Sequence, residues 1–246
     1  MNSFDVKDKI ALVTGSNRGI GEGFVKVLLQ QGAKKIYAAA RNLDNLKSIV
    51  AYDPQVIQPL LLDVTNADHI MKLKAQVGAL DILINNAGIA NACTSSSDQA
   101  LEIARLEMET NFFAPLQITQ TLLPLLKNSE QAAIVNISSI AGISNFPALG
   151  PYSATKAALH SLTQGLRTDL ASFNIQVVGV YPGPIDTRMA EGMDMDKPKP
   201  EQVAIKTFEA LKQGEIDVLP DDFSVQMYGA FLEHPHQLES AFAEMK

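Results

Sequence analysis

The residues best suited to chemistry lie in one stretch, residues 138–156, which reads SSIAGISNFPALGPYSATK. Tyr152 and Lys156 are four residues apart, so a helix that begins near Pro151 places both on one face, one turn apart. Ser139 precedes them across a segment rich in glycine, proline and asparagine, which can fold back and bring its hydroxyl to the phenol. We therefore expect these three side chains to meet.

Together the three side chains suit proton transfer to and from a carbonyl or alcohol oxygen. A tyrosine phenol has a pKa near ~10, which makes it a poor acid or base at neutral pH. A lysine ammonium about 4 Å away, at an effective dielectric of about 20, attracts the phenolate by an amount on the order of 4 kcal/mol. We therefore expect Lys156 to lower the pKa of Tyr152, and Ser139 to hold the substrate oxygen. The alternative is an amphipathic helix pair without a catalytic role.

The elements that must position these residues alternate between strand and helix along the whole chain. This pattern predicts an α/β fold, a doubly wound parallel sheet of the Rossmann type, in a single domain over residues 1–246. The expected strands are 10–14, 35–40, 56–62, 82–84, 134–137, 176–181 and 216–219. The expected helices are 22–31, 43–48, 66–76, 100–127, 151–172 and 201–213, with one or two more in 223–245.

A glycine-rich turn links the first strand to the first helix, and it has the context of a dinucleotide-binding loop. Glycines let the backbone approach a diphosphate, and the helix N-terminus offers free N–H groups. The spacing is Gly-x3-Gly-x-Gly, which differs from the general Gly-x-Gly-x-x-Gly pattern. A tight strand-to-helix turn is the alternative. The loop residues predicted to bind the cofactor are Gly15, Asn17, Arg18, Gly19, Ile20 and Gly21.

The residues after the second strand favour NADP(H), with NAD(H) the less favoured cofactor. An acidic residue at that place binds the 2′-hydroxyl of NAD, and here Ala39 and Ala40 replace it. Arg41 follows, and with Arg18 it would attract a 2′-phosphate. The alternative is that Arg41 is a solvated loop residue.

Polar residues follow two other strands, where open α/β sheets bind their ligands. Asp63 either contacts the adenine or starts the following turn. Asn86 and Gly88 stand at the end of the fourth strand, where a loop with Asx turns is the alternative. Asn111 is an unusual residue for the interior of the long helix expected over 100–127.

Composition excludes several classes of protein. The chain has 246 residues, a formal net charge of −7 and no basic cluster, which argues against nucleic-acid and membrane partners. Its one cysteine, Cys93, excludes an internal disulfide framework. The N-terminus lacks a signal-peptide pattern, so we expect a cytoplasmic protein. No metal site is predicted, because His234 and His236 fit a surface loop, and His160 is expected to pack rather than react.

Two segments follow the last of these motifs, a methionine-containing segment and a C-terminal tail. Residues 186–200 hold Met189, Met193 and Met195, which suit an adaptable apolar lid over a pocket or a disordered surface loop. The tail, about residues 215–246, completes the chain.

In combination, the motifs resemble those of the short-chain dehydrogenase/reductase family. The matching segments cover roughly residues 8–190 in the family's order. They are TGSNRGIG (14–21), LDV (62–64), NNAG (85–88), Asn111, VNISS (135–139), YSATK (152–156) and YPGPIDT (181–187).

The resemblance implies a role for each catalytic residue. Tyr152 is the acid or base, and Ser139 orients the substrate oxygen. Lys156 lowers the pKa of the tyrosine and binds the nicotinamide ribose, and Asn111 anchors a water that links Lys156 to solvent. The other predicted cofactor-binding residues, beyond the glycine loop, are Arg41, Asp63, Val64, Asn86, Ala87, Gly88, Tyr152, Lys156, Pro182, Gly183, Ile185 and Thr187.

The resemblance also implies a homodimer or homotetramer, but one segment departs from the family. Residues 215–222, EIDVLPDD, replace its usual Val-Asp-Gly-Gly-like turn, which bears on the tetramer contact and on the substrate class. The leading prediction is an NADP(H)-dependent carbonyl reductase or alcohol dehydrogenase for a small to medium, largely apolar substrate. The alternatives are a non-catalytic NADP(H)-binding regulatory protein, or an epimerase or dehydratase on the same fold.

Overall fold

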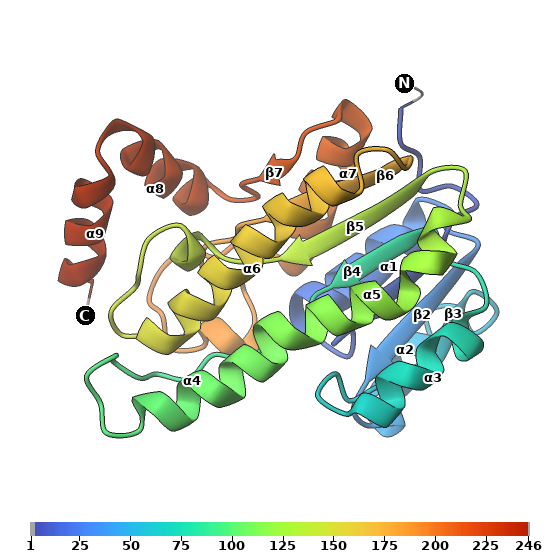
Figure 1. Ribbon diagram of the computed structural model, residues 1–246, viewed down its shortest axis with the longest axis horizontal. Helices are drawn as coiled ribbons and strands as arrows, with labels where there is room; N and C mark the ends of the chain where they lie inside the picture. The colour runs from blue at the N-terminus through green and yellow to red at the C-terminus, as the bar shows by residue number, and fades with distance from the viewer. Residues whose placement is uncertain (1–2, 246) are drawn as a thin grey trace.

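The computed structural model describes residues 3–245, and within them seven strands form one parallel sheet in the order β3-β2-β1-β4-β5-β6-β7 (Figure 1). Residues 1–2 and 246 of the predicted domain lie outside the described residues. Every expected strand is present, with ends that shift by at most two residues. The strands are β1 (Ile10–Thr14), β2 (Lys35–Ala40), β3 (Ile57–Leu61), β4 (Ile82–Asn85), β5 (Ala132–Ile137), β6 (Ile175–Val180) and β7 (Asp217–Val218).

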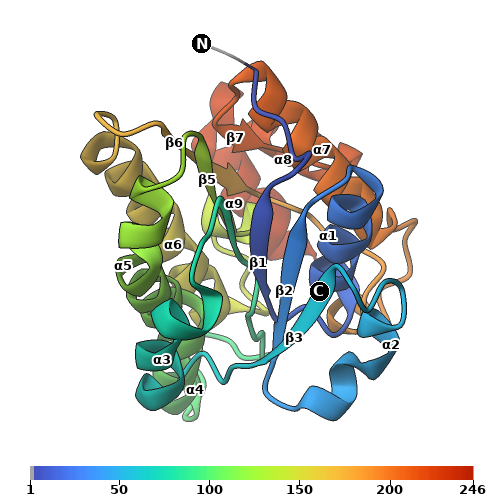
Figure 2. The same ribbon diagram turned by 90° about the vertical axis from the view of Figure 1, so that its right-hand side faces the viewer.

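Helices cover both faces of the sheet, and Figure 2 shows the two layers from the side. One layer consists of α1 (Gly19–Gln30), α2 (Lys47–Val50) and α7 (Pro200–Gln213). The other consists of α3 (Ala67–Val77), α4 (Ala100–Met108), α5 (Ala114–Lys127) and α6 (Gly150–Asp169). The tail forms α8 (Asp222–Glu233) and α9 (Pro235–Glu244), which lie to one side of the sheet in Figure 1.

Alternating strand residues build two cores, one on each face. In β1, Ala11 and Val13 face the α1 and α7 layer, while Leu12 faces the other layer. Both faces are therefore apolar, which is why the strands read as continuous apolar runs in the sequence. The ring of Phe24 on α1 meets that of Phe208 on α7 edge-on, with centroids 5.7 Å apart.

The helix expected over 100–127 is present, but a π-helical turn at Glu109–Phe113 interrupts it. This turn contains Asn111, whose side chain bonds to groups outside the helix. One extra residue in the turn changes the direction in which the neighbouring side chains point, and such turns are frequent at functional sites. The unusual asparagine therefore marks a real irregularity.

Among residues 3–245, no helix is both long and apolar enough to cross a membrane. The segment 186–200 forms a loop whose ends meet, since Asp186 N donates to Pro198 O at 3.0 Å. The side chains of Met189, Met193 and Met195 in this loop are exposed.

Candidate active site

The glycine loop after β1 is built so that a larger side chain would not fit. Gly15 and Gly19 have φ of +63° and +56°, a conformation that favours glycine. A Cβ added to Gly21 would lie 2.4 Å from the Gly15 carbonyl oxygen. No side chain caps the N-terminus of α1, where Arg18 is the N-cap residue. The turn therefore presents a bare backbone and free N–H groups, a suitable cradle for a diphosphate.

The end of β4 is tied to this loop through two side chains. The Thr14 hydroxyl accepts hydrogen bonds from the backbone N–H groups of Asn86 and Ala87, both at 2.9 Å. In return, the Asn86 amide donates to the carbonyl oxygens of Thr14 and Gly15, at 2.8 and 3.1 Å. The two loops meet at the point where the strand order reverses, between β1 and β4, which is the usual ligand crevice of such sheets.

Arg41 and Asp63 lie at the far side of the same edge. Arg41 is exposed after β2, and its charge favours the ionised form of Asp63. Burial would raise the pKa of Asp63, but hydrogen bonds from Thr65 and the charge of Arg41 outweigh it, so the pKa is lowered. The Asp63 carboxylate accepts from Thr65 N at 3.0 Å and from its hydroxyl at 2.8 Å. Asp63 therefore does start the following turn, and Val64 beside it is buried.

Ser139, Tyr152 and Lys156 converge as expected. The α6 helix carries Tyr152 and Lys156, and the Lys156 ammonium lies 5.6 Å from the centre of the Tyr152 ring. The Ser139 side chain lies close enough to the phenol to lower its pKa. Their exposed fractions are only 8% for Tyr152, 4% for Lys156 and 9% for Ser139. The set is therefore well shielded from solvent.

Burial reverses the pKa change expected for Tyr152. Desolvation raises the pKa of the phenol to about 12, although Ser139 opposes this rise. Burial also lowers the pKa of Lys156 to about 8. As the pH rises, Lys156 therefore loses its proton before Tyr152 does. At the pH where the phenol ionises, no ammonium remains to stabilise the phenolate. The prediction that Lys156 lowers the pKa of Tyr152 is wrong for the protein alone, since spacing reveals the charge pair but not its desolvation.

Asn111 joins the same site from the π-helical turn. Its side chain accepts from Ile89 N and donates to Ile89 O, both at 2.9 Å, and it also donates to the Thr155 hydroxyl. A Cβ added to Gly88 would lie 3.2 Å from Asn111 Oδ1 and 3.6 Å from Lys156 Nζ. Gly88 therefore leaves the space in which the asparagine and the lysine approach each other.

The loop after β6 closes the site and is fastened to the tail. The Ser139 hydroxyl donates to Pro182 O at 3.4 Å, and Gly183 N donates to the Asp221 carboxylate at 2.9 Å. Ile185 is buried, and a Cβ on Gly19 would lie 3.1 Å from the methyl group of Thr187. The structure thus brings all the predicted cofactor-binding segments to one edge of the sheet, with Arg41 at its outer end.

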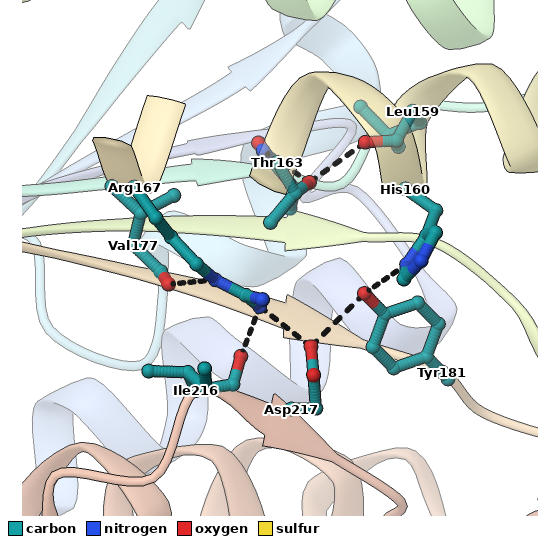
Figure 3. Close-up of polar contacts among 9 residues, drawn as sticks. Leu159, His160, Thr163, Arg167, Val177, Tyr181, Ile216 and Asp217 are labelled. Carbon is teal, nitrogen blue, oxygen red and sulfur yellow. Dashed lines mark hydrogen bonds and ion pairs between the residues drawn. The ribbon is translucent and has the colours of Figure 1, made fainter. Parts of the chain in front are cut away.

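His160 does more than pack. Its Nδ1 lies 2.7 Å from the Tyr181 hydroxyl, which donates to Asp217 at 3.1 Å (Figure 3). Asp217 in turn forms an ion pair with Arg167. This network links α6, which carries Tyr152 and Lys156, to the end of β6 and to β7.

Two sets of buried polar residues were not predicted from the sequence. The Asn85 amide donates to Asn136 at 2.9 Å, and Asn136 donates to the Thr163 hydroxyl at 3.0 Å, which joins β4, β5 and α6. Glu107 on α4 is also fully buried. An acidic residue at a helix position flanked by apolar ones was the available signal for Glu107, and nothing local distinguished Asn85 from Asn86.

Comparison with known families and proteins gives a consistent result. A family model described as short chain dehydrogenase matches residues 9–198. An uncharacterized oxidoreductase of Staphylococcus aureus (strain N315) is 36% identical over 216 residues, covering 84% of this chain and 92% of that protein. Another, from Staphylococcus saprophyticus, is 32% identical over 221 residues, covering 85% and 93%.

Solved structures agree over nearly the whole chain. A short chain dehydrogenase from Burkholderia cenocepacia J2315, in complex with NADP, has a TM-score of 0.90 at 30% identity and covers 97% of this chain and 99% of its own. An NADPH-bound carbonyl reductase from chicken fatty liver has a TM-score of 0.79 at 30% identity, covering 87% and 97%. The match to the Burkholderia cenocepacia structure covers 97% of this chain and therefore extends into the tail.

Proposed function

The chain belongs to the short-chain dehydrogenase family of oxidoreductases, and on this premise we propose that it transfers hydride between NADP(H) and a carbonyl or alcohol substrate. The observation that supports this most directly is the meeting of Asn111, Ser139, Tyr152 and Lys156 beside the glycine loop. A protein that only binds the dinucleotide has no need of a buried phenol and ammonium at that place.

The residues present fit a dinucleotide. The bare turn at Gly15, Gly19 and Gly21 suits the diphosphate, because added Cβ atoms would clash with neighbouring backbone or side chains. Asp63 and Val64 would hold the adenine end, and Asn86, Ile185 and Thr187 the nicotinamide end. When bound, the reduced cofactor would supply the hydride to the carbonyl carbon. The protein's part is to place the carbonyl and to move the proton.

The four residues divide the proton chemistry between them. Because burial keeps Tyr152 protonated at neutral pH, the phenol is ready to donate its proton to the substrate oxygen in the reducing direction. Ser139 would hold that oxygen by a hydrogen bond. Lys156 would bind the ribose hydroxyls, and Asn111, which already fixes Ile89, would hold the water that leads to solvent.

Two exposed arginines support a preference for NADPH. Arg18 and Arg41 flank the expected place of the 2′-phosphate, and the chain has alanine rather than an acidic residue at positions 39 and 40. Replacing Arg41 with alanine should weaken NADPH about 10–100-fold, the worth of one charge-assisted hydrogen bond, and leave NADH nearly unchanged. Steady-state KM values for both cofactors test this. Arg105→Ala, which removes an exposed arginine on α4, is the matched control. An equal loss for both cofactors would contradict the assignment.

The substrate is proposed to be small to medium and largely apolar. An apolar cluster that includes Ile140 and Phe146 follows Ser139 directly, and the tail completes it with Phe223 and Phe242. The likeness to a carbonyl reductase supports the same class. We also propose a homodimer or homotetramer, as the family resemblance implies, which light scattering would measure.

The decisive experiment is the oxidation of NADPH and NADH with a panel of aldehydes, ketones and quinones. Tyr152→Phe should lower kcat by about 10²–10⁴-fold, the worth of a positioned acid, while NADPH still binds. Tyr52→Phe, at a half-exposed tyrosine on the surface, is the matched control and should retain activity. Turnover that survives Tyr152→Phe would refute the mechanism. Product formation without net cofactor consumption would instead indicate an epimerase or dehydratase.

A further inference from the structure

Glu107 is a buried acidic residue that the mechanism above leaves without a role. It lies on α4, one helical turn before Asn111, with 0% of its side chain exposed. The other charged residues of α4, Glu102 and Arg105, are exposed, as is Glu109 just beyond its end. A carboxylate is costly to bury without partners, so Glu107 needs a compensating interaction.

One oxygen of Glu107 holds the loop that follows β4. Its Oε1 accepts from Asn91 N at 2.7 Å and from the Asn91 side-chain amide at 3.0 Å. Asn111 holds Ile89 in the same loop by two further bonds. Two side chains, one turn apart on the same helical stretch, therefore fix residues 89–91 beside Gly88, where Lys156 approaches.

The second oxygen of Glu107, Oε2, does not bind the loop. Among residues 3–245, Oε2 is buried and has no hydrogen-bond partner. The charge of Glu107 affects the pKa values of two titratable groups, Lys156 and Tyr152. Both lie on α6, which packs against α4. Burial raises the pKa of Glu107, while the Asn91 bonds and Lys156 oppose the rise. Glu107 in turn raises the pKa of Lys156 and of Tyr152.

We propose that Glu107 is a positioning residue for the reaction, which fixes the loop 89–91 through Asn91 and supplies a buried negative charge on the α4 side of the site that holds Lys156. This inference rests on the proposed function. It assigns to this one carboxylate two separable effects, one on loop geometry and one on charge.

The variant Glu107→Gln separates these effects. Its amide oxygen can still accept both Asn91 bonds, but the charge is lost. Proton donation leaves a phenolate that a charged Lys156 would stabilise, so reduction is favoured by a protonated Tyr152 and an ammonium at Lys156. Loss of the Glu107 charge lowers the pKa of both groups. The alkaline limb of kcat/KM should therefore move to lower pH by at least about one unit, the shift expected for two charges about 12 Å apart at an effective dielectric of about 20.

Two controls isolate the charge at that position. Glu109→Gln removes the same charge from an exposed position two residues away and should leave the limb in place. Asn91→Ala removes the loop bonds but keeps the carboxylate, so it should change KM or thermal stability without moving the limb. An unmoved limb in Glu107→Gln, with only reduced thermal stability, would show a purely structural role and overturn the proposal.

A direct titration of Lys156 tests the inference without turnover. In protein prepared without cofactor and labelled with ¹³C at lysine Cε, the Lys156 resonance, assigned by its loss in Lys156→Met, should titrate at lower pH in Glu107→Gln than in wild type. In wild type it should also show a smaller inflection where Glu107 titrates. Absence of that inflection would overturn the proposal even if Glu107→Gln does not fold. If no substrate turns over, the proposed function fails, while this titration still decides the role of Glu107.

Discussion

Burial separates the pKa values of Tyr152 and Lys156, the two residues of α6 with a proposed catalytic role. The pKa of Tyr152 is raised to about 12 and that of Lys156 is lowered to about 8, in each case mainly by desolvation. Both shifts favour the neutral form, so the site is poised to donate a proton from the phenol. The protein also bears a stability cost for the buried ammonium, because Lys156 carries its charge at neutral pH.

This cost predicts a pH-dependent difference between wild type and Lys156→Met. Between about pH 8 and 10.5, the folded protein binds fewer protons at Lys156 than the unfolded chain does, so raising the pH removes the penalty. The free energy of unfolding of wild type should therefore rise relative to Lys156→Met, by at most about 1.4 kcal/mol per pH unit. Urea unfolding at several pH values from 7 to 10 measures it.

The upper limit of pH 10 avoids the opposite contribution of Tyr152. Its pKa is raised, so its stabilisation is lost only as the pH rises from about 10 towards 12. Lys72→Met, at an exposed lysine on α3, is the matched control and should show no such slope. A constant difference between wild type and Lys156→Met would mean that Lys156 is not desolvated.

At the scale of elements, α1 and α7 pack closely because α1 has a glycine at their contact. A Cβ on Gly23 would lie 2.7 Å from the carbonyl carbon of Pro200, at the start of α7. The ion pair of Lys26 on α1 with Glu201 on α7 joins the same two helices. Because α1 also presents the glycine loop, this contact sets the position of the proposed diphosphate cradle.

A pair of glycine variants tests this packing. Gly23→Ala should lower the free energy of unfolding by about 1–3 kcal/mol, since α7 must move to admit the methyl group. Gly165→Ala makes the same change in an exposed part of α6, where no described atom lies within 4 Å of the added Cβ. It should stabilise by up to about 1 kcal/mol through helix propensity. Chemical denaturation compares them, and equal effects would mean that the α1–α7 contact is loose.

The helix α6 is held to the sheet by polar contacts at several positions along its length. Lys156 Nζ donates to Ile137 O at 2.8 Å, and its carbonyl accepts from the Ser138 hydroxyl at 3.0 Å. Further along, His160 and Arg167 reach Tyr181 and Asp217 (Figure 3). The orientation of the reactive face therefore depends on contacts with β5, β6 and β7.

At the scale of the whole molecule, the tail completes an apolar cluster beside the proposed active site. Phe242 on α9 has 1% of its side chain exposed, and its ring meets that of Phe146 edge-on at 5.6 Å. Ile140, next to Ser139, belongs to the same cluster. The tail thus packs on the segment that links the serine to the tyrosine.

Phe242→Ala should weaken the packing of this apolar cluster without unfolding the sheet. Loss of a buried aromatic side chain removes a few kcal/mol of packing, on the scale of about 3–5 kcal/mol in a core. We expect faster hydrogen exchange in 235–244, unchanged exchange in the central strands, and a higher KM with a smaller change in kcat. Leu232→Ala, at an exposed position on α8, should change none of these. An unaltered KM would separate the tail from the substrate pocket.

The sequence by itself determined the sheet and predicted the members of the proposed site. Buried parallel strands appear as apolar runs, and glycine turns and the Tyr-x-x-x-Lys spacing are local patterns, so they can be recognised without any contact between distant segments. The sequence also marked Asn111 as unusual for a helix interior, and the structure has a π-helical turn there.

Only the tertiary structure decided how the site is tuned and closed. The direction of the Tyr152 pKa shift, the burial of Glu107 and the docking of the tail on Phe146 all depend on segments far apart in the chain. Desolvation is a property of everything that surrounds a group, and spacing along the sequence does not measure it. For this protein, local pattern therefore specified which residues form the proposed site, and packing decided which of their protonation states is favoured.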